Sequence, residues 1–187
     1  STSGDNGPAL AATFLGVNSI WGNSADRIFI VDTQARVVRE VNSGSLIISN
    51  YAGTGSSGSG GDLGFASSAK LNSPTQIYGD STGNNYICDF SASRIRKVDN
   101  NRIITTFAGT DSAGYSGDGN RATSASLKNP QGVFADSVGK VYIADRGNDV
   151  IRVVASNGFI STLAGTGTAG FSGDGGPSSL AKLDNPY

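Results

Sequence analysis

The chain has 187 residues, with 27 glycines, one cysteine, no histidine, no methionine and a formal net charge of −1. This length supports one domain with a sizeable core, and abundant glycine with few charged residues favours short strands and many turns over helices or disorder. The balanced charge argues against nucleic acid as a partner, because that requires clustered cations. No apolar run is long enough to span a membrane, so we expect no membrane insertion. The lone Cys88 excludes an internal disulfide and is expected to be a small buried hydrophobe.

A short segment rich in Ser and Ala recurs along the chain. Its four copies are Asp5–Phe14, Asp62–Leu71, Asp118–Leu127 and Asp174–Leu183. Each of the first three copies is followed by a strand-like motif that ends in Asp, by a second one that ends in Arg, and by an Ala-Gly-Thr motif. In the third unit these motifs are Tyr142–Asp145, Val150–Arg152 and Leu163–Thr166. The sequence therefore contains three complete repeat units and the start of a fourth.

We expect each unit to be a blade of four antiparallel strands. In chain order, the blades cover about residues 18–53, 75–109 and 131–165, and long loops cover 54–74, 110–130 and 166–187. The strands of the third blade are predicted at Gly132–Asp136, Lys140–Arg146, Val150–Ser156 and Phe159–Gly165, with turns that contain Gly139, Asn148 and Gly158. Only Ala66–Leu71 has the pattern of a helical turn. Since one blade cannot bury both of its faces, neighbouring blades must stack around an axis, which predicts an all-β propeller.

Several of these motifs resemble NHL repeats, of the long type that also occurs in the propeller of teneurins. They are Ala164–Pro177, Asn129–Val133, Val141–Asp145 and Val150–Arg152. The resemblance implies blades of a propeller that usually has six. Members of this family bind proteins, RNA or glycans, or serve as extracellular architecture, and a minority of NHL-like propellers are metal-dependent lyases or lactonases. Such repeats predict the fold far better than the function.

The number of units leaves two hypotheses about assembly. Propellers need about four to eight blades to close, so three units do not form a ring. Either the sequence is a window from a longer array, as the absence of Met also indicates, or separate copies complete one another. In the second case, two half-rings form one ring or copies join head to tail into a fibre.

Aspartate and arginine recur seven residues apart across the second turn of each unit. The pairs are Asp32 and Arg39, Asp89 and Arg96, and Asp145 and Arg152. Across an antiparallel hairpin the two side chains are expected to face each other, which stabilises a sheet by about 0.2–1 kcal/mol. A ring of charges lining a channel is the alternative. We favour a structural clamp, because a catalytic site seldom recurs in every unit.

Two further sets of aligned residues are candidate sites. The aromatic set occupies one position of the innermost strand and comprises Trp21, Tyr78 and Phe134. Packing between blades explains it, and only Trp21 is a candidate ligand platform. The acidic set lies in the Gly-rich loops and comprises Asp62, Asp118 and Asp174. A calcium site needs about six oxygen ligands, so we expect turn carboxylates that cap backbone amides instead.

The residue types argue against catalysis. Without histidine the chain lacks the usual general base and the imidazole ligands of a metal enzyme, so we predict no catalytic residue, no metal and no cofactor. We expect a non-enzymatic extracellular or surface propeller for protein interaction, adhesion or assembly, whose partners are other protein chains, copies of itself included. Its Ser/Thr-rich loops are candidates for O-linked glycans. The alternative is a fragment of an NHL-like lyase or lactonase whose metal ligands lie outside this sequence.

Overall fold

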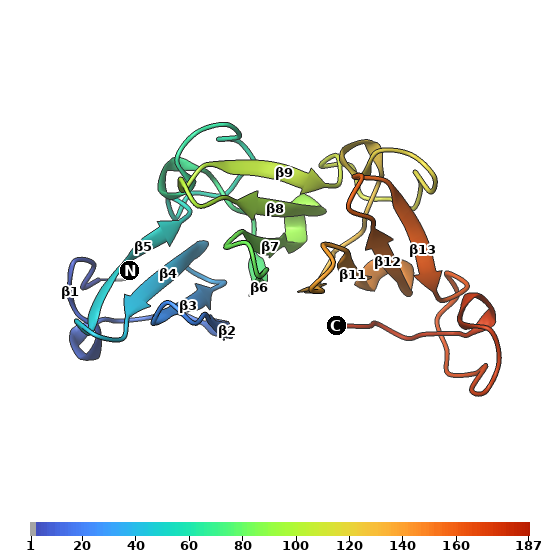
Figure 1. Cartoon of the computed structure of the whole chain (residues 1–187), viewed down its shortest axis with the longest axis horizontal. Helices are drawn as coiled ribbons and strands as arrows, with labels where there is room; N and C mark the ends of the chain where they lie inside the picture. Colours follow the sequence, from blue (N-terminus) through green and yellow to red (C-terminus); the bar gives the residue numbers. More distant parts are fainter. Residues whose placement is uncertain (1–2) are drawn as a thin grey trace.

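The computed structural model describes residues 3–187, which form three antiparallel sheets side by side in an arc (Figure 1). The first sheet contains β1 (Gly7–Pro8), β2 (Val17–Gly22), β3 (Arg27–Asp32), β4 (Val37–Asn42) and β5 (Ile47–Ala52). The second contains β6 (Pro74–Gly79), β7 (Asn85–Asp89), β8 (Arg94–Val98) and β9 (Ile104–Ala108), and the third contains β10 (Gly132–Ala135), β11 (Val141–Asp145), β12 (Val150–Val154) and β13 (Ile160–Ala164). The predicted all-β fold of four-stranded antiparallel blades is confirmed.

Short polar turns join the strands within each blade. Between β6 and β7, the Asp80 carboxylate accepts hydrogen bonds from the backbone N–H groups of Thr82 and Asn84, both at 2.9 Å. Asp136 caps the corresponding turn between β10 and β11 in the same way. Gly139 in that turn has a φ of +83°, a conformation that glycine adopts without steric cost. This turn chemistry explains why the strands reverse direction where the sequence predicts.

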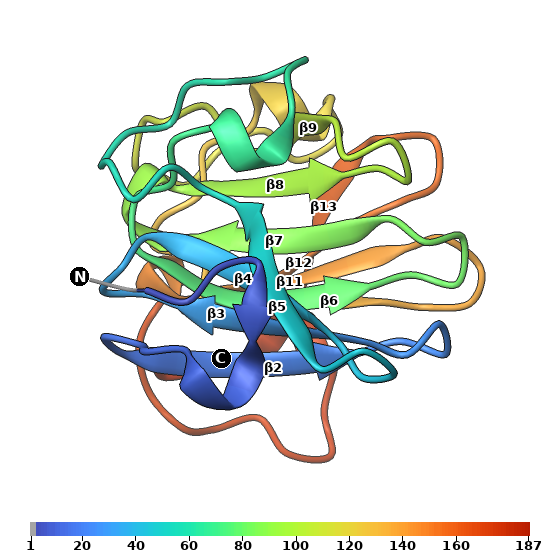
Figure 2. The ribbon, with the colours of Figure 1, turned by 90° about the vertical axis from the view of Figure 1, so that its left-hand side faces the viewer.

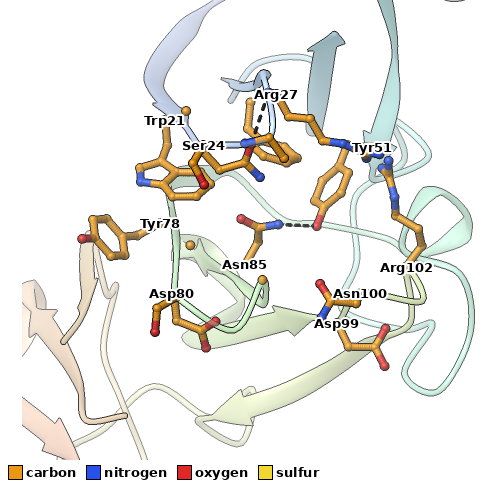
Figure 3. A pocket seen from close by; sticks show the side chains of 17 residues that line it. Trp21, Ser24, Arg27, Tyr51, Tyr78, Asp80, Asn85, Asp99, Asn100 and Arg102 are labelled. Atoms are coloured by element: carbon orange, nitrogen blue, oxygen red, sulfur yellow. Dashed lines mark hydrogen bonds between the residues drawn. The ribbon is translucent and has the colours of Figure 1, made fainter. Parts of the chain in front are cut away.

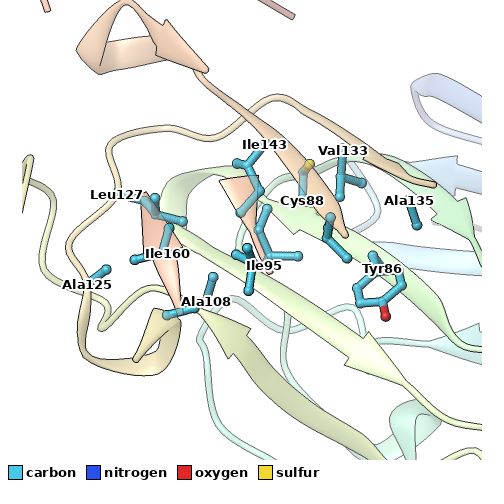
Figure 4. Packing of buried hydrophobic residues seen from close by; sticks show 13 residues of the cluster. Tyr86, Cys88, Ile95, Ala108, Ala125, Leu127, Val133, Ala135, Ile143 and Ile160 are labelled. Carbon is cyan, nitrogen blue, oxygen red and sulfur yellow. The ribbon is translucent and has the colours of Figure 1, made fainter. Parts of the chain in front are cut away.

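Apolar side chains from neighbouring blades form two separate cores. The core between the second and third blades is shown in Figure 4 and consists of Tyr86, Cys88, Ile95, Ala108, Ala122, Ala125, Leu127, Val133, Ala135, Val141, Ile143, Val154 and Ile160. The core between the first and second blades contains residues at the equivalent positions, such as Phe29, Val38, Leu71 and Ile77. Burial of apolar area at these interfaces is the main force that holds the blades together.

The long loops after the first and second blades cover the outer edge of the blade that follows them. After β5, the N–H of Gly53 donates to the carbonyl of Ala66 at 2.9 Å, and the N–H of Leu63 donates to the carbonyl of Ile104 in β9 at 2.8 Å. In the first blade the corresponding contact is the pairing of β1 with β5, which is visible when the first blade faces the viewer (Figure 2). Each of these two loops therefore ties two blades together and covers an outer strand that would otherwise expose unpaired backbone groups.

Every helical segment in the described residues is a single turn of 3-10 helix. These segments are η1 (Ala9–Ala11), η2 (Ala66–Ser68), η3 (Phe90–Ala92), η4 (Ala122–Ser124), η5 (Arg146–Asn148) and η6 (Ser178–Leu180). The helical turn predicted over Ala66–Leu71 is thus shorter and tighter than an α-helix. None of the helices within residues 3–187 has the length and hydrophobicity that crossing a lipid bilayer requires.

Candidate functional site

The recurring arginine of each blade is the centre of a buried polar cluster. Arg152 in β12 has no solvent exposure, and it donates to the carboxylate of Asp118 at 2.6 Å and to the carbonyl of Ser116 at 3.1 Å. Its guanidinium lies over the ring of Tyr115, 5.2 Å from the centroid. Arg39 and Arg96 bind Asp5 and Asp62 in the same way. Each arginine therefore holds the long loop against the blade that follows it.

The predicted pairs Asp145 and Arg152, Asp89 and Arg96, and Asp32 and Arg39 are not directly opposite each other. In the third blade Asp145 lies opposite Val150, and Arg152 lies opposite Ile143. The ion pair between Asp145 and Arg152 is therefore diagonal and long, at 3.6 Å. The turn has four residues instead of two, because the three residues of η5 and the left-handed Asp149 occupy it. The expectation of a facing pair was wrong for this reason, although both residues are buried in the same cluster.

The strand aspartates bind the segment that enters each blade. The carboxylate of Asp145 accepts from the N–H of Lys128 at 2.7 Å, and that of Asp89 accepts from the N–H of Asn72 at 2.6 Å. The carboxylate of Asp32 similarly accepts from the N–H groups of Leu15 and Gly16. Burial raises the pKa of Asp89 and of Asp145 to about 6, because the arginine charge and these hydrogen bonds only partly offset the loss of solvation.

These raised pKa values predict a pH dependence of stability. A carboxyl group with a higher pKa in the folded state stabilises the fold when it is protonated, and that contribution is lost as the pH rises from 3.8 through about 6. We expect the free energy of unfolding to fall by roughly 1 kcal/mol per pH unit for each group in this window. Urea unfolding across the window measures it. The double substitution Asp89→Asn and Asp145→Asn should remove the slope, whereas Asp26→Asn, at an exposed position, should keep it.

The loop aspartates do not make the local turns that we expected. Asp62 accepts from the side chain and N–H of Thr106, 44 residues away, and binds Arg96, so it is a long-range clamp and not a local turn carboxylate. Partial burial raises its pKa, but the hydrogen bond from Thr106 and the charge of Arg96 together lower it below the usual value. Asp118 makes the equivalent contacts with Thr162 and Arg152. Asp174 is exposed, and no ion pair is recorded for it within residues 3–187.

The aromatic side chains of the innermost strands form a row across the blades. The ring centroids of Trp21 and Tyr78 are 5.8 Å apart, and those of Tyr78 and Phe134 are 5.0 Å apart. Trp21 also stacks on Phe29 of its own blade. Phe134 remains 49% exposed at the other end of the row. The structure thus places all three residues in contacts between blades, and Trp21 and Tyr78 additionally line a groove.

The first blade presents one half of an inter-blade interface to solvent. Ile20 in β2 is 66% exposed. Its counterparts Ile77 and Val133 are 1% and 4% exposed, because they pack against the preceding blade. Val17 at the start of β2 is exposed in the same way, whereas its counterpart Pro74 is buried. The exposed face of the first blade is therefore apolar at the positions that the second and third blades bury against the preceding blade.

The third blade presents the opposite half. Ile151 in β12 is half-buried, while its counterparts Ile95 and Val38 are fully buried against the following blade. Leu163 in β13 is 42% exposed, whereas Tyr51 at the same position of the first blade is 3% exposed. The two open faces thus carry complementary halves of the interface that joins consecutive blades within the chain.

Comparisons with known proteins agree with this architecture. The Teneurin NHL domain family matches residues 111–173. Teneurin-4 of Mus musculus is 48% identical over 50 residues, which are 27% of this chain and 2% of that protein. The chain therefore spans a very small part of this relative.

Solved structures share the fold at low sequence identity. A protein of unknown function from Bacteroides thetaiotaomicron has a TM-score of 0.71 at 19% identity, and an auxiliary nutrient binding protein from the same organism has a TM-score of 0.69 at 16% identity. Each alignment covers 91% of this chain and 41% of the other. Virginiamycin B lyase from Staphylococcus aureus aligns over 79% of this chain and 41% of its own, with a TM-score of 0.53 at 14% identity.

The family match covers the third blade and most of the loop before it. The first and second units carry the same motifs and fold into the same four-stranded sheets. The resemblance that the sequence motifs indicate is thereby confirmed: residues 111–173 match the Teneurin NHL domain family, and the other two units are similar to the matched one in motif and fold.

Proposed function

We propose that this chain is a non-enzymatic protein-interaction and assembly module whose first and third blades pack against blades of a second copy. One observation carries the proposal, which is the pair of complementary open faces on the first and third blades. Inside the chain, the same two faces bury Ile77 and Ile95 completely or almost completely. Large exposed apolar patches of this kind mark protein interaction sites. A head-to-tail contact between copies would repeat a packing that the chain already uses twice.

The first and third blades also carry two copies of one repeated segment, which we call the clasp because in the first blade it covers an outer strand and binds an arginine. The segment that contains Asp5 covers β5 and binds Arg39. The equivalent segment that contains Asp174 is attached to the third blade through a hydrogen bond from the N–H of Gly165 to the carbonyl of Ser178, at 3.0 Å. In a head-to-tail contact the Asp174 segment of one copy replaces the Asp5 segment of the next copy on Arg39. Such an exchange of identical elements is a low-cost route to assembly.

The other parts of the proposal follow from composition and from the relatives. The chain has no histidine, which supports a role without catalysis. The teneurin match supports an extracellular or cell-surface location and a role in adhesion. The Ser/Thr-rich loops offer positions for O-linked glycans. The lyase with the same fold is only 14% identical, so its likeness supports the fold alone.

The substitution Asp174→Asn tests the clasp exchange. Because Asp174 is exposed and no ion pair is recorded for it, the change should leave the thermal unfolding of the monomer unaltered. It should weaken self-association about fivefold, since it removes a carboxylate that, like Asp118 beside Arg152, is only partly buried and contributes about 1 kcal/mol. Sedimentation velocity over a concentration series measures the change.

Matched controls separate the clasp and the apolar face from general effects of charge. Asp26→Asn makes the same charge change in an exposed turn and should leave association as it is. Ile20→Asp should abolish association, whereas Val138→Asp should not, because Val138 is 69% exposed but lies in the turn between β10 and β11 and not in a strand of an open face. A wild-type chain that stays monomeric at every concentration, or equal association of the Ile20 and Val138 variants, would overturn the proposal.

A further inference from the structure

A groove of about 670 Å³ lies between the first and second blades, at the end where β2 and β6 finish (Figure 3). Its walls include Trp21, Tyr51, Tyr78, Asn85 and Arg102. The groove does not belong to the open faces or to the clasps described above. Its lining is mostly polar, in contrast to the core that lies directly beneath it.

The residues that line this groove depart from the repeat. Asn85 begins β7, and the residues at its position in the first and third blades are Ile28 and Val141. Tyr51 has Phe107 and Leu163 as its counterparts. At the equivalent place between the second and third blades, Val141 and Phe107 belong to the apolar core or pack against it. Features that recur in every unit serve the fold, so changes that occur once and converge on one place indicate a site.

Asn85 has an unsatisfied buried acceptor. The residue is only 5% exposed, and its side-chain N–H donates to the hydroxyl oxygen of Tyr51 at 2.7 Å. Its carboxamide oxygen is buried and has no hydrogen-bond partner. Figure 3 shows this oxygen on the side of the carboxamide that points away from Tyr51. A buried acceptor without a donor is costly, so the groove is suited to a ligand that brings an O–H or N–H group.

The charged side chains of the groove are held in place and nearly balanced. Arg27 and Arg102 both donate to the buried carboxylate of Glu40, at 2.7 and 2.6 Å. Arg102 also lies over the ring of Tyr51 at 4.7 Å, and burial raises the pKa of Tyr51 to about 12, so its hydroxyl stays neutral. Two arginines and two aspartates line the groove. With Glu40, two arginines stand against three carboxylates, and this formal charge of −1 disfavours an anion and is too small to hold a cation strongly.

An aromatic edge fits beside the unsatisfied acceptor because Gly79 has no side chain. A Cβ atom at Gly79 would lie 2.3 Å from the ring of Trp21 and 2.7 Å from the carboxamide oxygen of Asn85. The counterpart of Gly79 in the third blade is Ala135, which belongs to the apolar cluster against which Tyr78 packs. The indole and the carboxamide therefore meet at one wall of the groove, with an apolar surface next to a hydrogen-bond acceptor.

We propose that this groove binds a neutral saccharide. Aromatic rings suit the apolar faces of a sugar ring, and planar carboxamide and guanidinium groups suit its hydroxyls. One sugar hydroxyl donates to the carboxamide oxygen of Asn85, while the free N–H groups of Arg27 and Arg102 donate to other hydroxyl oxygens. A small ligand in an open polar groove of this size binds weakly, with an affinity of about 1 mM.

The fluorescence of Trp21 reports binding directly, because it is the only tryptophan of the chain. The probes are the methyl glycosides of glucose, galactose, mannose and N-acetylglucosamine, with inorganic phosphate as the anionic comparison. We expect a saturable change with at least one glycoside. The double substitution Asn85→Val and Tyr51→Phe restores the apolar residues that the repeat uses at Val141 and Phe107, so the variant should fold. We expect it to bind the glycoside at least about tenfold more weakly.

Asn120→Val is the control, since this residue is exposed in the loop before the third blade and should not alter binding. The proposal is overturned if none of the four glycosides gives a saturable change, or if the double variant binds as the wild type does. Preferential binding of phosphate would also overturn it. Circular dichroism of each variant separates loss of the site from loss of the fold.

Discussion

Replacing Arg152 by leucine is expected to lower the free energy of unfolding by about 3–5 kcal/mol. The guanidinium is fully buried and contacts the carboxylate of Asp118 and two backbone carbonyls, those of Ser116 and Ser126. Without it, the buried carboxylate of Asp145 loses the cation that lies 3.6 Å away, and the loop before the third blade loses its anchor. Equilibrium unfolding in urea measures the loss, and limited proteolysis should show cleavage within residues 110–130.

Two comparisons make this result specific. Asp118→Asn removes a carboxylate that is 47% exposed, so its cost should be nearer to about 1 kcal/mol. Arg146→Leu removes an arginine for which no ion pair is recorded in residues 3–187, and it should change stability by about 0.5 kcal/mol or less. If the free energy of unfolding of the Arg152 variant lies within about 1 kcal/mol of the wild-type value, the arginine is not the anchor of the loop.

Replacing Gly109 by alanine is expected to cost about 3 kcal/mol or more. Gly109 follows β9 with a φ of +95°, and its N–H donates to the carbonyl of Ala122 at 3.0 Å. A Cβ atom there would lie 2.3 Å from the carbonyl oxygen of Ser93, which is backbone and cannot turn aside. The change therefore strains both the blade and the start of the long loop. Urea unfolding again provides the measurement.

Gly119 provides the matched control. Its φ is +78°, but nothing lies within 4 Å of the Cβ position, so Gly119→Ala should cost only about 1–2 kcal/mol from the left-handed backbone. The difference between the two variants isolates the steric contact. Equal losses at Gly109 and Gly119 would contradict a steric role for the close approach. The same crowding recurs at Gly53 and Gly165, beside the carbonyls of Arg36 and Asp149.

These two predictions concern one feature, the long loop that follows each blade. Gly109 fixes the direction in which the chain leaves the second blade, and Arg152 holds the returning segment on the third. The loop is therefore part of the fold, and its length follows from the distance it must travel around an outer edge. The segment that contains Asp174 is the copy of this loop that follows the third blade, and Asp174 binds no arginine within residues 3–187. The proposed assembly rests on this segment.

The repeat units, the four strands of each blade and the approximate places of the turns follow from the sequence alone, whereas the length of the turn between β11 and β12 does not. They rest on local physical preferences, such as the φ of +83° at Gly139 and the alternation of apolar residues on neighbouring strands. These preferences depend on residues a few positions apart, and every unit shows them again. The NHL resemblance rests on the same local motifs.

Contacts over longer separations were decided only by the tertiary structure. The partner of Arg96 is Asp62, which is 34 residues away, because the loop returns to the outer edge of the next blade. The groove with the unsatisfied oxygen of Asn85 arises because two blades bring Tyr51 and Asn85 together. An alignment of the units shows that Asn85 differs from its counterparts. It does not show which of the differing residues contact one another, because that depends on how the blades pack. Local preferences are encoded residue by residue, whereas the meeting of distant side chains depends on the path of the whole chain.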